Sequence, residues 1–115
     1  CLYPEKKHLS ENIKVVSVIG RFLEHSRIFW FGNNGNSEVF IGSADWMRRN
    51  LDRRVEAVAP IDSEEIKHKL ENLLNTYLED NREGWEMKSD GTFNLRHPQK
   101  GELSAQHQLI DAWTK

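Results

Sequence analysis

The residues best suited to take part in a chemical reaction lie around His25. Its imidazole stands two residues before the guanidinium of Arg27, and both precede an apolar, aromatic run. Side chains two apart on a strand project to the same side, so His25 and Arg27 are expected to point the same way. Histidine titrates near neutral pH and can act as nucleophile, general acid or hydrogen-bond donor, while arginine pairs with phosphate oxygens through its planar fork. The spacing therefore predicts a site that handles a phosphate group.

A second polar group follows on the next expected strand, in the run Gly42-Ser43-Ala44-Asp45. The Ser43 hydroxyl can donate to a phosphate oxygen, and the Asp45 carboxylate can fix the tautomer of an imidazole by accepting from its second nitrogen. A lone histidine at the end of a strand is more often a surface or half-buried structural residue. Because these neighbours accompany His25, the functional interpretation is favoured here.

Arginines cluster further along the chain, at Arg48, Arg49, Arg53 and Arg54. Such a cluster raises the local positive potential and suits a polyanion. The alternative is a solvated helix face in which Arg48 pairs with Asp52 four residues on, and for Arg48 and Arg53 this alternative is at least as well supported. Arg49 is expected to support the site. Arg54 is expected to open a strand, where it can be held beside the hairpin edge that carries His25.

Metal and nucleotide motifs of the common kinds are missing from the sequence. The chain has one cysteine and no His-x-x-x-His pair, so no metal site is predicted. The other histidines are His8, His68, His97 and His107. None of them stands at a spacing from another that is typical of metal ligands. There is also no Gly-x-x-x-x-Gly-Lys-Ser/Thr loop, so a nucleotide is not expected to bind through a Walker-type cradle.

Composition predicts one globular domain. The chain has 115 residues, of which 37% are hydrophobic and 30% charged, and its net charge of −2 implies no overall attraction to nucleic acid or anionic lipid. Cys1 is the only cysteine, so an internal disulfide is excluded and a reducing, cytoplasmic setting is expected. No apolar run approaches the roughly 20 residues that span a bilayer, so no membrane span is expected. The opening Cys1-Leu2-Tyr3-Pro4 reads like the middle of a polypeptide, and we expect a piece of a longer protein.

The first part of the chain predicts strands. Residues 13–19 are rich in β-branched side chains and are expected to form a largely buried strand. Residues 27–31 and 38–42 are expected to form an antiparallel hairpin, because residues 32–36 between them tolerate positive φ. A short link, helical or irregular, is expected over residues 46–51. A fourth strand is expected over residues 54–59.

The second part of the chain predicts two helices around a small hairpin. Asp62 or Ser63 with Glu65 resembles a capping box, and apolar residues from Ile66 to Leu78 follow at helical spacing, so an amphipathic helix should pack on the sheet. A hairpin is expected over residues 85–95 and a closing helix over residues 103–113. The predicted fold class is α/β: a single domain with a mixed sheet and flanking helices.

Three runs carry a resemblance to a known family: Ser10-Glu11-Asn12-Ile13, Gly20-Arg21-Phe22-Leu23-Glu24-His25-Ser26-Arg27-Ile28, and Ser43-Ala44-Asp45-Trp46-Met47-Arg48-Arg49-Asn50-Leu51-Asp52-Arg53-Arg54-Val55-Glu56. Together they closely resemble the last catalytic domain of bacterial polyphosphate kinases, which make inorganic polyphosphate from ATP. The resemblance is specific over residues 1–60 and looser through the helical tail. It implies that residues 1–115 are a C-terminal, phospholipase D-like domain, in a fold where two related domains each contribute a histidine motif to one active site.

The chain departs from the wider phospholipase D pattern, His-x-Lys followed by an Asp and then Gly-Ser-x-Asn. Arg27 stands in the place of the Lys, Gly32 in that of the first Asp, and Asp45 in that of the Asn. These departures argue against cleavage of lipid or nucleic-acid phosphodiesters and fit the kinase branch better, although Gly32 leaves the acidic role of its position unfilled. Two alternatives stay open: a phospholipase D-like phosphodiesterase half-domain, and a phosphate- or polyphosphate-binding module without activity.

The resemblance also implies roles for particular residues. His25 corresponds to the second active-site histidine, which contacts the transferring phosphate, and Arg54 to an arginine that faces nucleotide phosphates. The phosphorylated histidine nucleophile of the family, its magnesium-associated residues and a further phosphate-binding arginine are all expected outside this chain. Residues 1–115 alone are therefore expected to be inactive.

The partners implied by the resemblance are ATP or ADP, inorganic polyphosphate and the preceding domains of the same polypeptide. A homo-oligomer is expected for the whole enzyme, and no nucleic acid is expected to bind.

Overall fold

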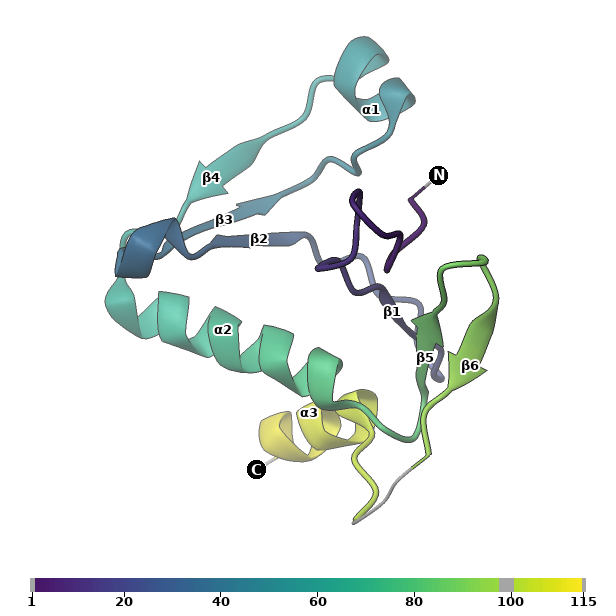
Figure 1. The fold of residues 1–115 in the computed structure, drawn as a ribbon. Helices are drawn as coiled ribbons and strands as arrows, with labels where there is room; N and C mark the ends of the chain where they lie inside the picture. Colours follow the sequence, from purple (N-terminus) through teal and green to yellow (C-terminus); the bar gives the residue numbers. More distant parts are fainter. Residues whose placement is uncertain (1, 98–100, 115) are drawn as a thin grey trace. The chain divides into compact units, whose positions relative to one another are not determined.

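The computed structural model describes residues 2–97 and 101–114 of the chain. The elements along the chain are β1 (Val16–Val18), β2 (Ile28–Phe31), the short 3-10 helix η1 (Asn33–Gly35), β3 (Glu38–Gly42), α1 (Arg48–Arg53), β4 (Val58–Pro60), α2 (Glu64–Glu79), β5 (Gly84–Met87), β6 (Phe93–Leu95) and α3 (Ala105–Trp113) (Figure 1). They divide between two compact units, Glu24–Leu74 on the one hand and Cys1–Leu23 with Asn75–Lys115 on the other. We call the first the hairpin unit and the second the terminal unit.

The hairpin unit is built on a three-stranded antiparallel sheet in the order β2-β3-β4. The tight connection between β2 and β3 has positive φ at Asn33, Asn34 and Gly35, the residue types that adopt this conformation most readily. The predicted hairpin is therefore confirmed, and the second strand of the pair has the predicted bounds.

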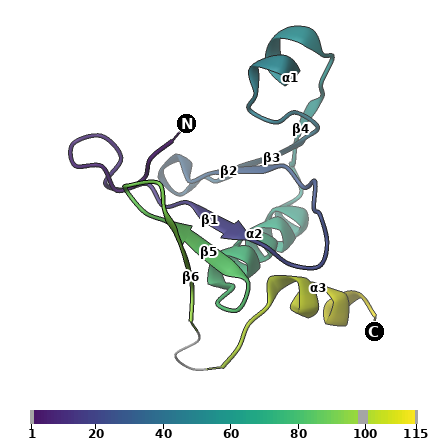
Figure 2. The ribbon, with the colours of Figure 1, turned by 90° about the vertical axis from the view of Figure 1, so that its right-hand side faces the viewer.

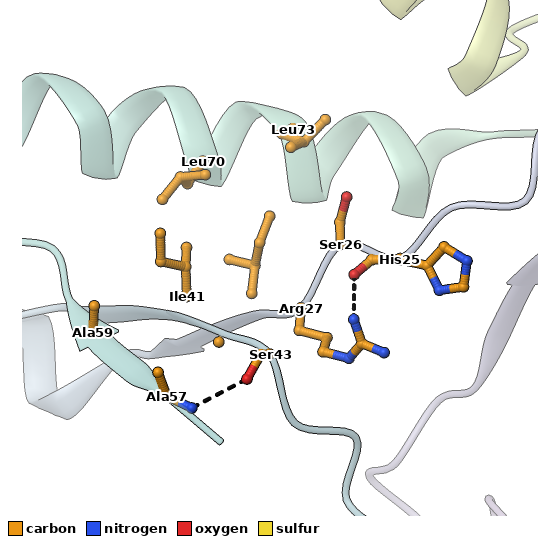
Figure 3. Close-up of a pocket in the computed structure, with 11 residues that line it drawn as sticks. His25, Ser26, Arg27, Ile41, Ser43, Ala57, Ala59, Leu70 and Leu73 are labelled. Atoms are coloured by element: carbon orange, nitrogen blue, oxygen red, sulfur yellow. Dashed lines mark hydrogen bonds between the residues drawn. The ribbon is translucent and has the colours of Figure 1, made fainter. Parts of the chain in front are cut away.

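The two faces of this sheet carry different side chains. Ile28, Ile41 and Ala59 are paired across the strands and share one face, whereas Phe29 and Phe40 share the other. Leu70 and Leu73 point from α2 toward the first face (Figure 3). The predicted amphipathic helix is thus present and turns apolar residues toward the sheet.

The terminal unit holds a second antiparallel sheet in the order β1-β5-β6. Its strands lie side by side in Figure 2. Asp80 in this unit is fully buried, and its carboxylate accepts from the backbone N–H groups of Arg82, Glu83 and Ala105 at 3.0, 2.7 and 2.7 Å. A buried carboxylate needs such donors. Because one of them belongs to the first residue of α3, Asp80 helps to set where that helix begins.

Gln106, on α3, binds the backbone of Phe22 through both ends of its amide. Its Oε1 accepts from the Phe22 N–H at 2.9 Å, and its Nε2 donates to the Phe22 carbonyl at 2.8 Å. The Gln106 side chain also lies against Gly20, where a Cβ would stand 2.5 Å from Oε1. This close approach gives a physical reason for glycine at position 20.

The predicted α/β class is confirmed, but the sheet arrangement differs from the prediction. The strands form two antiparallel sheets of three strands each, where one mixed sheet was expected. The first strand, β1, is shorter than residues 13–19 and half-buried. The predicted hairpin and closing helix near the C-terminus are confirmed as β5, β6 and α3. The assignment of residues 1–115 to one domain stays a prediction, and Cys1 lies outside the described residues.

The predicted fourth strand starts later than expected, with β4 at Val58 and not at Arg54. The physical reason is a contact with Ser43: the Ala57 N–H donates to the side-chain hydroxyl of Ser43 at 3.1 Å. This N–H therefore makes no ladder hydrogen bond with a backbone carbonyl of β3. Arg54 instead follows α1 as its C-terminal cap. The link predicted over residues 46–51 contains the start of α1, a short helix. Among the described residues, no helix is both long and apolar enough to cross a membrane.

Replacing Gly20 with Ala should lower the stability of the chain by about 1 to 3 kcal/mol, because the new methyl group overlaps the Gln106 amide. The measurement is the free energy of unfolding, followed by circular dichroism during urea denaturation. Gly32→Ala is the control, since a Cβ there meets only the Trp30 ring at 3.4 Å. The loss at position 20 should be smaller in a Gln106→Ser background. Additive losses in the double variant would contradict the contact.

Candidate functional site

The hairpin unit contains an open hollow of about 530 Å³ between its sheet and α2. His25, Ser26, Arg27 and Ser43 supply its polar lining, and Ile41, Ala59, Leu70 and Leu73 are among its apolar residues (Figure 3). The structure therefore brings together three of the residues that the sequence singled out: His25, Arg27 and Ser43.

Arg27 is the most firmly held of these residues. Its Nε donates to Asp45 Oδ1 at 2.8 Å, and its Nη1 donates to the backbone carbonyl of His25 at 2.7 Å. Its side chain is only 23% exposed. These two bonds use two of the five N–H donors of a guanidinium, so donors are left for an anion in the hollow. Arg27 is thus oriented from two directions while it keeps its capacity to bind phosphate.

The ion pair between Arg27 and Asp45 shifts both titrations. The hydrogen bond from Arg27 holds the pKa of the Asp45 carboxyl below its ordinary value, and the nearby charge of Arg49 adds to this effect. The same hydrogen bond, together with the charges of Asp45 and Glu56, raises the pKa of Arg27. Desolvation opposes both shifts but does not cancel them. The pair is therefore ionised across the neutral range.

Asp45 does not have the partner that the sequence predicted for it. It was expected to accept from the imidazole of His25, but in the hairpin unit its carboxylate accepts from Arg27. A guanidinium carries a permanent charge and several donors in one plane, so it is the stronger partner for a carboxylate. Arg49 acts on Asp45 through its charge. Asp45 consequently orients the arginine of the site.

Ser43 is already engaged in the structure. Its hydroxyl donates to Glu56 Oε2 in a short hydrogen bond and accepts from the Ala57 N–H at 3.1 Å. A serine hydroxyl has one proton to donate, so Ser43 can donate to a phosphate only if Glu56 moves away. The role of Ser43 in phosphate binding stays a prediction.

Glu56 is a residue of the site that sequence reasoning missed. It accepts from Ser43, and its charge contributes to the raised pKa of Arg27. Nothing in its local sequence distinguishes it from an ordinary strand-edge glutamate. Only the pairing of the residue 43 backbone with the residue 57 backbone, N–H to O at 3.0 Å, brings it beside the hollow.

Within the arginine cluster, Arg48 follows the alternative of a solvated helix face. Arg48 pairs with Asp52 at 3.1 Å, and its side chain is 92% exposed. Arg54 was expected to open a strand beside the hairpin edge, but it caps α1 in extended conformation and is not among the residues that line the hollow. The prediction of its position is wrong, because β4 begins only at Val58. Its proposed contact with nucleotide phosphates is not tested by this geometry.

The residues of the hollow do not fit a magnesium site. In residues 2–97 and 101–114, no group of three or more His, Cys, Asp or Glu side chains lies close enough to hold a metal ion. The carboxylates of Asp45 and Glu56 accept from Arg27 and Ser43, which line the hollow. The magnesium-associated residues that the family resemblance implies are still expected outside this chain.

Comparison with known proteins assigns this arrangement to a family. The model described as "Polyphosphate kinase C-terminal domain 2" matches residues 1–108. The chain is 64% identical over 115 residues to a polyphosphate kinase of Prochlorococcus marinus (strain MIT 9313), which covers 98% of this chain and 16% of that protein. It is 54% identical over 110 residues to a polyphosphate kinase of Synechocystis, covering 96% of this chain and 15% of that protein.

A solved structure agrees with these sequence matches. The crystal structure of polyphosphate kinase from Porphyromonas gingivalis superposes with a TM-score of 0.85 at 34% identity, over 91% of this chain and 16% of that one. The chain belongs to the polyphosphate kinase C-terminal domain family, and its predicted phospholipase D-like fold class is confirmed. It spans about 16% of the length of the first curated relatives it matches.

Replacing Asp45 with Asn should lower the thermal unfolding midpoint at neutral pH and leave it nearly unchanged at about pH 2. The folded-state pKa of Asp45 lies below the ordinary value of 3.8, so the ion pair stabilises the fold above that value. The contribution is lost as the pH falls through the folded-state pKa. Differential scanning calorimetry of the unchanged chain and of Asp45→Asn between pH 2 and 7 measures the difference in unfolding midpoint.

Asp52→Asn is the matched control, because Asp52 pairs with the exposed Arg48 and should contribute little. An Asp45→Asn deficit that is the same at pH 2 and pH 7 would show that the ion pair is not its cause.

Proposed function

We propose that this chain forms the C-terminal part of a polyphosphate kinase, which reversibly transfers the γ-phosphate of ATP to inorganic polyphosphate. The single observation that carries the proposal is that His25 and Arg27 line one hollow in a chain that belongs to this family. His25 is the catalytic residue of the chain. The curated relatives bear the name polyphosphate kinase, and the activity is proposed here for the longer protein of which such a chain forms part.

The chemical task of the site is to neutralise phosphate oxygens while a phosphoryl group moves. Phosphoryl transfer depends mostly on positioning and on electrostatic stabilisation, for which preoriented cations are the effective groups. Arg27 meets this requirement because Asp45 and the His25 carbonyl hold its guanidinium. His25 contacts the transferring phosphate and serves as acid, base or charge stabiliser. Arg54 is proposed to face nucleotide phosphates, and Arg49 to support the site through its charge near Asp45.

The phosphoryl group is proposed to pass first to a histidine outside residues 1–115 and then to the end of a polyphosphate chain. Magnesium, when bound to the whole enzyme, would neutralise phosphate charge, with ligands from outside this chain. The further partners proposed are the preceding domains of the same polypeptide and a second copy of the whole enzyme. A cytoplasmic location is proposed from the cysteine content alone.

Replacing His25 with Ala in the whole enzyme should reduce ATP-dependent polyphosphate synthesis by about 100-fold or more, the usual loss when an acid–base group is removed. The measurement is incorporation of the ATP γ-phosphate into acid-insoluble polymer. His68→Ala is the control, since the His68 side chain is 73% exposed on α2 and lies beside Glu71. Near wild-type turnover of the His25→Ala enzyme would contradict the catalytic role of His25 and favour a binding module without activity. Cleavage of a model phosphodiester without ATP would favour a phospholipase D-like enzyme.

The purified 115-residue chain should form no polyphosphate from ATP, because the proposed phosphohistidine lies elsewhere in the enzyme. The same assay, run with the chain alone and with the whole enzyme at equal molar concentration, tests this. Polymer synthesis by the chain alone would contradict the proposed division of the active site.

A further inference from the structure

Glu56 is a carboxylate at the candidate site to which the proposed reaction gives no role. It is half-buried and lies in the segment between α1 and β4. Its Oε2 accepts from the Ser43 hydroxyl in a short hydrogen bond, and Ser43 lines the hollow together with Arg27 (Figure 3). A negatively charged side chain is therefore held beside a hollow whose polar groups suit an anion.

The hydrogen bond to Glu56 is one that a phosphate oxygen could also accept. The Ser43 hydroxyl accepts from the Ala57 N–H at 3.1 Å and has one proton to donate. In the structure that proton is donated to Glu56. Carboxylate and phosphate oxygens are both charged acceptors, so the two groups are alternatives at the Ser43 hydroxyl.

Glu56 also acts on Arg27, the cation that is expected to bind phosphate. The hydrogen bond to Asp45 is the largest cause of the raised pKa of Arg27, and the charges of Asp45 and Glu56 raise it further. The same negative charge of Glu56 repels an anion bound to the remaining donors of Arg27. A phosphate group must therefore replace Glu56 at Ser43 and also overcome its charge.

The other carboxylate of the site has a different function. Asp45 accepts directly from Arg27 Nε at 2.8 Å, so its departure would release the guanidinium. Glu56 is hydrogen-bonded to a neutral hydroxyl, and its long side chain can rotate away while Asp45 keeps Arg27 in place. Glu56 is thus the carboxylate that a phosphate can displace without loss of the oriented arginine.

We propose that Glu56 sets the affinity of the site for phosphate: its carboxylate competes for the Ser43 hydroxyl and opposes the anion at Arg27, so a phosphate group binds by displacing it. The inference rests on the proposed function in one respect, because the displacing group is taken to be a phosphate of ATP or polyphosphate. The consequence is a weaker hold on phosphate than Arg27 and Ser43 would give without Glu56. A reversible transfer benefits from a weak hold, since tight binding of the ground state does not speed the reaction.

Binding of tripolyphosphate to the purified whole enzyme, measured by isothermal titration calorimetry without ATP, tests the proposal. Glu56→Gln removes the charge and keeps an oxygen that can accept from Ser43, whereas Glu56→Ala removes both and adds no donor. We expect the dissociation constant to fall about tenfold in Glu56→Gln, the order of effect of one unit charge near a surface cation. It should fall further in Glu56→Ala. Damage to the fold would weaken binding, so a gain in affinity distinguishes this role from a structural one.

Glu38→Gln is the matched control, because it makes the same chemical change elsewhere on the same sheet. Glu38 is exposed and pairs with Phe31, at the opposite end of the hairpin from Arg27. The dissociation constant should hardly change in this variant. The gain in Glu56→Gln should also disappear in an Arg27→Gln background, which would assign it to this hollow.

An unchanged or weaker affinity in Glu56→Gln would overturn the proposal, and so would an equal gain in Glu38→Gln or a gain that persists in the Arg27→Gln background. No further gain in Glu56→Ala would contradict the competition for Ser43. Polyphosphate synthesis, measured on the unchanged whole enzyme, tests the proposed function separately. An enzyme that made no polyphosphate, but bound tripolyphosphate more tightly as Glu56→Gln, would contradict the proposed function and not the role of Glu56.

Discussion

The ion pair between Arg27 and Asp45 is the interaction on which the candidate site depends. It joins the residue just before β2 to the segment just after β3, and so closes the end of the hairpin at which the hollow lies. Arg27 also donates to the backbone of His25. One guanidinium therefore orients the segment that carries the histidine and presents its remaining donors to an anion.

Two carboxylates share the work of balancing this guanidinium. Asp45 accepts a hydrogen bond from Arg27 directly, while Glu56 acts on Arg27 through its charge. Glu56 also accepts a hydrogen bond from the Ser43 hydroxyl. The charge of Arg27 is thus partly balanced by these carboxylates in the structure. A phosphate must compete with Glu56 for Ser43, whereas the free donors of Arg27 are available to it without competition.

The two faces of the β2-β3-β4 sheet divide the roles of the hairpin unit. One face, with α2 above it, forms the hollow that His25 and Arg27 line. The other carries exposed aromatic side chains beside a basic helix. The alternation of side chains along β2 and β3 produces both surfaces from the same few residues, so a shift of register by one residue would exchange them.

Sequence alone was sufficient for what depends on local patterns. The turn at residues 33–35, the two strands beside it, α2, the hairpin of β5 and β6, and α3 all follow from turn residues and from apolar spacing. His25 and Arg27 do share the hollow, but both precede β2, and Ser26 between them lines the hollow as well, so strand alternation does not account for their grouping. The partners of these residues depended on tertiary structure. Three features are decided by contacts between residues far apart in the chain: whether Asp45 binds His25 or Arg27, whether the Ala57 N–H donates to a backbone carbonyl or to the Ser43 hydroxyl, and whether Glu56 reaches the site. In each case several donors could bond to the same acceptor, and the bond that forms depends on which groups the fold brings close together. The periodicity of the sequence does not contain that information.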